Sequence, residues 1–140
     1  MCLLNTKFAL KACKGEFIGT GYKLMGAYEI PKMRVWHKAA LKNDANAKPK
    51  QLKTEDSENY DNPDTYRAGF HIFLKQEDAV KYQSIHPCYN VYEVKFKVVT
   101  AFGPNQLYAD YSRADCVIAE YIKYEKNLGT QKEVIERLKK

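Results

Sequence analysis

The sequence has no apolar stretch near the roughly 18 residues that a membrane-spanning helix needs. The apolar run within residues 1–7 is too short for an export signal. Its 4 cysteines include no CxxC pair, and no histidine follows them at a zinc-finger spacing. Pro87, between His86 and Cys88, is typical of a turn and not of a metal ligand pair. We therefore expect reduced thiols, no metal site, no membrane partner and a cytoplasmic protein.

Familiar catalytic motifs are also missing. The chain contains no Walker loop, HExxH, GxSxG, kinase motif set or EF-hand. No cysteine is adjacent to a histidine in the sequence, so the sequence gives no local support for a Cys–His nucleophile. With 140 residues, 45% of them hydrophobic and 29% charged, the chain fits one globular domain, residues 1–140, that folds without a cofactor.

Tyrosine and positive charge are what the sequence has in excess. It contains 11 tyrosines against 6 phenylalanines and 1 tryptophan, and its net charge is +6. Tyrosine suits half-buried strands and also recognition surfaces, because it joins a flat apolar ring to a polar hydroxyl. The charge favours acidic partners such as nucleic acid or an acidic protein surface, although it also serves solubility. Both interpretations stay open.

Alternation of apolar and polar residues with a period of two predicts several strands. The clearest covers residues 91–99, where Val94, Phe96 and Val98 are expected to face the core. Strands are also expected over residues 7–13, 16–18, 22–25, 33–39, 69–74 and 115–124. In the last of these, a bulge is allowed, and the side chains expected on one face are Val117, Ala119 and Tyr121.

Three segments are expected to lack strands. The pair Gly19 and Gly21 allows backbone angles that other residues avoid, and residues 102–105 are typical of a turn. Residues 43–66 are poor in branched apolar side chains and cannot bury enough area to offset the entropy of ordering. We expect this segment to be a mobile charged insertion, and its basic half contains Lys48, Lys50 and Lys53.

Two helices are predicted. The acidic residues at 77–78 precede the apolar Ala79, Val80 and Tyr82, which favours a short internal helix. Thr130 and Glu133 have the spacing of a capping box at the start of a C-terminal helix. Together these elements predict an α+β fold: one mostly antiparallel twisted sheet of five to seven strands, one short internal helix and one C-terminal helix.

The order of a Gly-Phe-His strand, a short helix and a late strand containing Glu120 resembles the core of small phage-encoded proteins of unassigned function. It also resembles the ADP-ribosyltransferase fold. That resemblance implies NAD as cofactor, with Tyr22 or Lys23 contacting it, His71 and Tyr82 lining the nicotinamide pocket, and Glu120 stabilising the ribosyl cation. The first-strand Arg or His of that family is absent, as is the acid or amide two residues before the glutamate.

Alternation over residues 33–39 is expected to put Arg34, Trp36 and Lys38 on one face. An aromatic ring between cations is typical of surfaces that hold single-stranded nucleic acid, although Trp36 could instead pack on the sheet.

Three functions follow from these observations. The preferred one is a phage-type accessory protein without a cofactor that binds and inhibits or sequesters a host or anti-phage defence component, either a protein or a nucleoprotein complex. The second is an NAD-using enzyme related to ADP-ribosyltransferases. The third is a nucleic-acid-binding module.

Overall fold

The computed structural model describes residues 18–26, 32–39, 51–53, 65–67, 69–107 and 112–140, with the backbone alone for 51–53 and 65–67. The elements in chain order are β1 (Gly19–Gly26), β2 (Trp36–Lys38), β3 (Gln51–Lys53), β4 (Thr65–Arg67), β5 (Phe70–Phe73), α1 (Gln76–Lys81), β6 (Tyr89–Gln106), β7 (Arg113–Thr130) and α2 (Gln131–Leu138). The predicted α+β class is confirmed, with a five-stranded antiparallel sheet and two helices. The strands expected over residues 7–13 and most of 16–18 lie outside the described residues.

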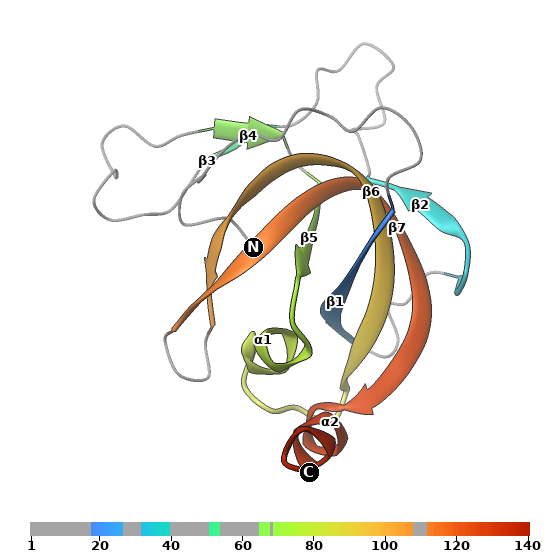
Figure 1. The fold of residues 1–140 in the computed structure, drawn as a ribbon, viewed down its shortest axis with the longest axis vertical. Coiled ribbons are helices and arrows are strands. Elements are labelled where there is room, and N and C mark those ends of the chain that lie inside the picture. The colour runs from blue at the N-terminus through green and yellow to red at the C-terminus, as the bar shows by residue number, and fades with distance from the viewer. Residues whose placement is uncertain (1–17, 27–31, 40–50, 54–64, 68, 108–111) are drawn as a thin grey trace.

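A long hairpin of β6 and β7 dominates the sheet and curves over the other strands (Figure 1). The strand order is β2-β7-β5-β1-β6, and β6 also pairs with β7. Strands β7, β5, β1 and β6 therefore form a ring, and β2 is added at the edge of β7. The join between β1 and β5 is the shortest in this ring, with Tyr22 opposite Phe73 as its one registered pair.

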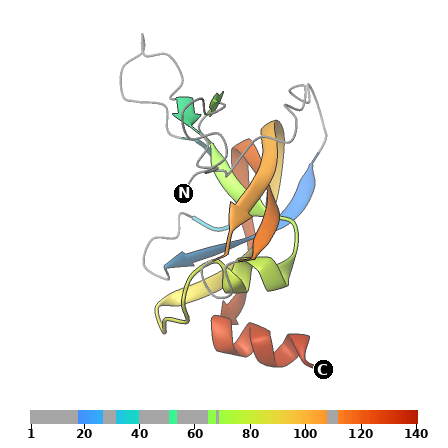
Figure 2. The same cartoon turned by 90° about the vertical axis from the view of Figure 1, so that its left-hand side faces the viewer.

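Two clusters of buried side chains lie on the two sides of the sheet. The helix-side cluster joins strand residues such as Leu24, Phe73 and Ile118 to Val80 of α1 and Val134 of α2. The strand-side cluster consists of strand residues alone, namely Ile72, Tyr92, Val94, Phe96, Val99, Val117, Ala119, Ile122 and Tyr124. Figures 1 and 2 both show α1 and α2 at one end of the molecule, so the helices cover one end of the sheet.

The hairpin changes its buried face midway along. Val98 has a φ of 59°, in the left-handed region that β-branched residues rarely adopt. Before it, Val94 and Phe96 face the strand-side cluster, and after it Val99 does so instead of Val98. The prediction that Val98 shares their face was therefore wrong. On β7 the same change puts Ile122, and not Tyr121, with Val117 and Ala119.

Bulges account for the curvature of the hairpin, but their extra residues are Thr100 of β6 and Glu125 and Leu128 of β7, and none lies within residues 115–124, where the sequence allowed one. The register shifts by one residue between Val91 and Tyr92, between Glu93 and Val94, and between Val99 and Ala101. Each extra residue increases the local twist of a strand. The turn expected at residues 102–105 is absent, because β6 continues through Phe102 to Gln106 and pairs with the start of β7.

Gly19 and Gly21 do not break the strand pattern, contrary to the prediction, because both belong to β1. Their role is close packing. A Cβ at Gly21 would meet the Ile72 side chain and lie 2.8 Å from the Phe73 carbonyl oxygen, and one at Gly19 would meet the Phe96 ring. Glycine thus lets β1 approach β5 and the strand-side cluster.

The segment expected as an insertion contains two short strands. β3 and β4 pair with each other, with Gln51 opposite Arg67 and Lys53 opposite Thr65. Backbone pairing thus replaces loop at residues 51–53 and 65–66, the insertion as a whole stays a prediction, and residues 43–50 and 54–64 lie outside the described ones. The strand predicted over residues 33–39 is shorter, since β2 covers Trp36–Lys38 alone.

The Thr130 half of the capping box predicted for α2 is present, and the Glu133 carboxylate bonds the Thr130 hydroxyl in place of the Thr130 amide. The Thr130 hydroxyl oxygen accepts a hydrogen bond from the Glu133 amide at 3.3 Å and donates to the Glu133 carboxylate at 3.1 Å. Buried Gln131 then ties the two helices together. Its amide nitrogen donates to the carbonyl oxygens of Val80 and Gln83, and its amide oxygen accepts from the His86 backbone.

Candidate anion-binding face

Two rows of side chains cross three adjacent strands where the helices leave the sheet uncovered. In the first row Trp36 lies opposite Lys123, which lies opposite Lys95. In the second row Lys38 lies opposite Tyr121, which lies opposite Lys97. Directly opposed residues of an antiparallel pair point to the same side. We call these six residues the Lys–Trp face.

The Trp36 ring is the centre of this face. The Lys97 ammonium nitrogen lies 4.4 Å from the centre of the ring, and that of Lys123 lies 5.0 Å away. Lys97 also lies 5.1 Å from the centre of the Tyr121 ring. These are cation–π distances, and they bring two lysines and two half-buried aromatic rings together from β2, β6 and β7.

Positive charge is concentrated on the face at some cost to stability. Lys95 lies directly opposite Lys123, and like charges in that position are destabilising. Two acids relieve part of this charge: Glu125 pairs with Lys123 at 3.2 Å, and Glu120 pairs with Lys38 at 3.7 Å. Among the residues that the structure describes, Lys95 and Lys97 form no ion pair. Within that part of the chain, an anion could bind both ammonium groups without displacing a carboxylate.

Backbone strain also gathers around this face. In the described part of the chain, Arg34 and Val98 are the non-glycine residues with positive φ, at 62° and 59°. Arg34 precedes Trp36 by two residues, and Val98 follows Lys97 directly. The Arg34 amide donates to the Tyr124 carbonyl at 2.8 Å, which fixes this conformation against β7. Such strain is frequently found at functional sites.

The residues predicted for an NAD site are distributed over different surroundings. His71 is 6% exposed and lies opposite Ile118 of the helix-side cluster. Tyr82 packs on Phe73, with the ring centres 5.5 Å apart. The Glu120 carboxylate, in contrast, pairs with Lys38 at the edge of the Lys–Trp face.

Lys23 lies beside His71 where β1 diverges from β5. Its ammonium group donates to the His71 carbonyl oxygen at 3.2 Å and so satisfies a backbone group in this gap. Burial lowers the pKa of Lys23. Burial, followed by the nearby Lys23 charge, lowers the pKa of His71 to about 3, so the imidazole is neutral. Burial likewise raises the pKa of the Cys116 thiol to about 12, and this thiol is unreactive at neutral pH.

The residues predicted to bind a partner also lie in different parts of the molecule. Trp36 and Lys38 belong to the Lys–Trp face, and Arg34 lies in the turn that leads to it. Tyr22 instead packs against the helix-side cluster. Lys53 belongs to β3, of which the structure describes the backbone, and Lys48 and Lys50 lie outside the described residues.

Four residues of the face were not selected from the sequence, namely Lys95, Lys97, Tyr121 and Lys123. The period-two pattern did place Lys95 and Lys97 on the wet face of their strand. What it could not supply is the cross-strand register that brings them to Trp36, because β2 pairs with β7 across 83 to 87 positions of sequence (121 − 38 and 123 − 36).

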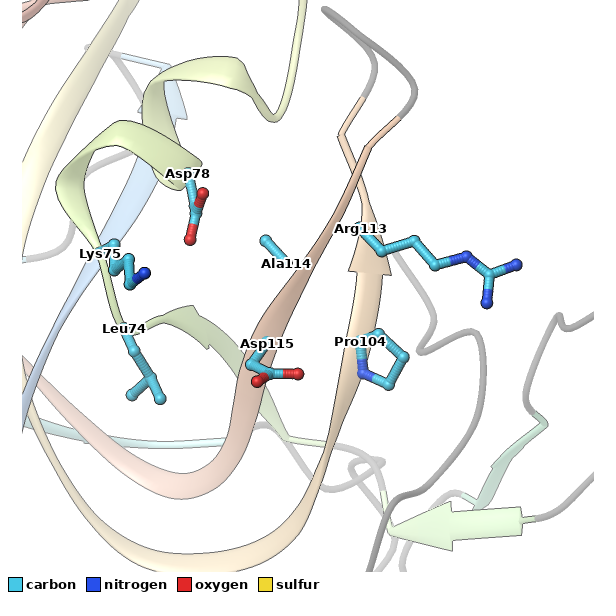
Figure 3. Close-up of a pocket in the computed structure, with 7 residues that line it drawn as sticks. All are labelled: Leu74, Lys75, Asp78, Pro104, Arg113, Ala114 and Asp115. Atoms are coloured by element: carbon cyan, nitrogen blue, oxygen red, sulfur yellow. The ribbon is translucent and has the colours of Figure 1, made fainter.

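A pocket of about 480 Å³ lies elsewhere, between the start of α1 and the tip of the β6–β7 hairpin. It is lined by Leu74, Lys75, Asp78, Pro104, Arg113, Ala114 and Asp115 (Figure 3). Figure 3 shows Arg113 extending away from Lys75 and Asp78. The lining includes two acids and two bases, so its formal charges cancel.

No protein-family model matches the chain, and comparisons with curated proteins and with solved structures found no match. In the described part of the chain, no helix is both long and apolar enough to cross a membrane. The described histidine, cysteine and acidic residues form no group of three or more that could hold a metal ion. The geometry of the Lys–Trp face is therefore the basis for proposing a function.

Proposed function

We propose that this protein acts by binding, and that its Lys–Trp face captures a negatively charged component of a host cell or of its anti-phage defence. In this proposal it is a phage-type accessory protein that works in the host cytoplasm by inhibition or sequestration. The observation that carries the proposal is the convergence of Lys97 and Lys123 on the single Trp36 ring.

Charge supports an acidic partner. The net charge of the chain is +6, and Lys95 and Lys97 lack ion pairs among the described residues. Holding Lys95 opposite Lys123 costs folding free energy that an apolar or oppositely charged pair would save. An anionic partner would convert this repulsion into binding energy, because the lysines are gathered before the partner arrives.

The open position of the face supports a macromolecular partner. Strand β2 lies at the edge of the sheet, and Lys38 is half exposed, with 51% of its side chain accessible. A two-row surface spread over three strands presents an area and not a closed cavity. Aromatic side chains within such an area are typical of the residues that contribute most to macromolecular binding.

The proposal is tested with two variants of equal net charge. Lys97→Gln/Lys123→Gln removes two charges from the face, and Lys132→Gln/Lys139→Gln removes two from exposed positions on or beside α2. On immobilised heparin, a polyanion, we expect the face variant to elute at clearly lower salt than the α2 variant. Equal elution of the two variants would overturn the proposal, because total charge would then explain the binding.

A further inference from the structure

We infer that the anionic partner is a single-stranded nucleic acid, bound by exchange of the contacts around Trp36. In the free protein the ammonium groups of Lys97 and Lys123 lie over the Trp36 ring. In the complex a base stacks on the ring, and Lys97 and Lys123 turn to the phosphates on either side of that base. This inference rests on the proposed function and specifies its ligand.

The contacts around Trp36 are suited to exchange. Cation–π contacts at accessible sites are weak, and Lys97 is shared between the Trp36 and Tyr121 rings at 4.4 and 5.1 Å. A lysine is a flexible point charge that can reach a phosphate from the same backbone position. Stacking of a base on an indole ring is stronger than such a contact and tolerates any base. A base can therefore displace the two lysines from the Trp36 ring.

The spacing of the lysines fits an extended phosphate chain. Lys95 and Lys97 are two residues apart on β6, which separates their Cα atoms by about 7 Å. Lys123 lies across from Lys95 on the neighbouring strand. Two cations thus lie over the Trp36 ring, a third lies one strand further along the same row, and the Tyr121 ring lies beside Lys97. This is the combination of backbone contacts and stacking that single-strand binding needs.

An acidic protein would use this surface less completely. Carboxylates can neutralise the lysines, as Glu125 and Glu120 do for Lys123 and Lys38, but they make no use of the aromatic rings. A nucleic-acid duplex keeps its bases stacked internally and is read by an element that enters a groove. The Lys–Trp face is a sheet surface with no helix on it, so unstacked bases suit it better.

The single tryptophan provides a direct measurement, because all indole emission comes from Trp36. The probes are oligothymidylate and oligouridylate of about 12 nucleotides, within the range of single-strand sites, together with a duplex of equal length, heparin and polyglutamate. We expect both single strands to bind and to quench the emission, whereas heparin binds without quenching. Binding should weaken with salt with a logarithmic slope of about −2 for three phosphate contacts.

Variants separate stacking from charge. Trp36→Ala should weaken oligothymidylate binding about 5- to 150-fold, and Trp36→Phe should restore most of this loss because it keeps a ring. Lys97→Gln/Lys123→Gln should reduce the salt slope by about 1.4, and Lys132→Gln/Lys139→Gln should leave it unchanged.

The outcomes distinguish the nucleic-acid inference from the proposed function. Binding of heparin or polyglutamate through the face, with single strands no tighter than the duplex and no quenching, overturns the nucleic-acid inference and leaves the proposed function standing. Failure of every polyanion to bind overturns both. If single strands quench the Trp36 emission equally in the Lys97→Gln/Lys123→Gln variant, the inferred exchange of lysine contacts from the ring to the phosphates is also overturned.

Discussion

One side of strand β6 passes through two very different environments. Near its start, Val91 is fully buried under the helices in the helix-side cluster. Four and six residues further on, Lys95 and Lys97 point to the same side and belong to the open Lys–Trp face. Between them β6 passes two register shifts in its pairing with β7, and the helix-side cluster includes Val91 but neither lysine.

The covered end satisfies the polar side chain of Gln131, whereas the open end holds two lysines directly opposite each other. Under the helices, Gln131 is 0% exposed, yet it uses both its amide nitrogen and its amide oxygen in hydrogen bonds. On the open face, Lys95 is placed against Lys123, and strained Val98 lies next to Lys97. Proteins tend to depart from good packing and charge pairing at functional sites, so the contrast favours function at the open end.

The largest effect should come from breaking the covered end at Gln131. Gln131→Ala leaves the Val80 and Gln83 carbonyl oxygens and the His86 amide without their partner, and it opens a cavity. We expect a loss of about 3 kcal/mol in the free energy of unfolding, measured by urea denaturation. The neighbouring exposed Lys132→Ala should change it by less than about 0.5 kcal/mol. Equal, small losses in both variants would show that the helices are not tied together by Gln131.

The second effect concerns His71, which is buried on the covered side. Its pKa is lowered from 6.5 to about 3 in the folded protein. Between these values the unfolded chain binds the proton and the folded chain does not, so stability is complete above pH 6.5 and falls as the pH drops. The free energy of unfolding should decrease by about 1.4 kcal/mol per pH unit between about pH 6 and pH 4.

His71→Gln supplies the control for this pH dependence. The variant cannot take up the proton, so its unfolding free energy should vary less over the same range, with the remaining slope due to carboxyl groups. Urea denaturation at pH 7, 6, 5 and 4 would compare the two proteins. Parallel curves would show that His71 is accessible to protons in the folded state.

Local sequence patterns correctly predicted the two helices that cover one end of the sheet. The spacing of Thr130 and Glu133 was sufficient to place the start of α2, because a capping box depends on residues three apart. The acids before Ala79 likewise indicated α1. These features are local, so a single sequence contains all the information that they need.

The errors share a nonlocal cause. Gly19 and Gly21 are in a strand because Phe96 and Ile72 require space, and residues 102–105 continue β6 because the start of β7 pairs with them. The change of face at Val98 depends on coiling of the whole hairpin. The same limit hid the Lys–Trp face, of which the sequence indicated Trp36 and Lys38 but not the lysines that pairing brings to them.

The smallest effect should come from relaxing the open end, and it should have the opposite sign. Lys95→Glu replaces the like-charge pair with Lys123 by an opposite-charge pair in the same register. We expect the free energy of unfolding to rise by about 0.2–1 kcal/mol, while binding to a polyanion weakens. Lys132→Glu, with the same change in net charge, should leave polyanion binding unchanged, and any gain in its stability comes from an acid in the first turn of α2. If Lys95→Glu destabilised the protein, the charges of the face would be there to hold the fold together, and the contrast between the two ends of β6 would lose its functional meaning.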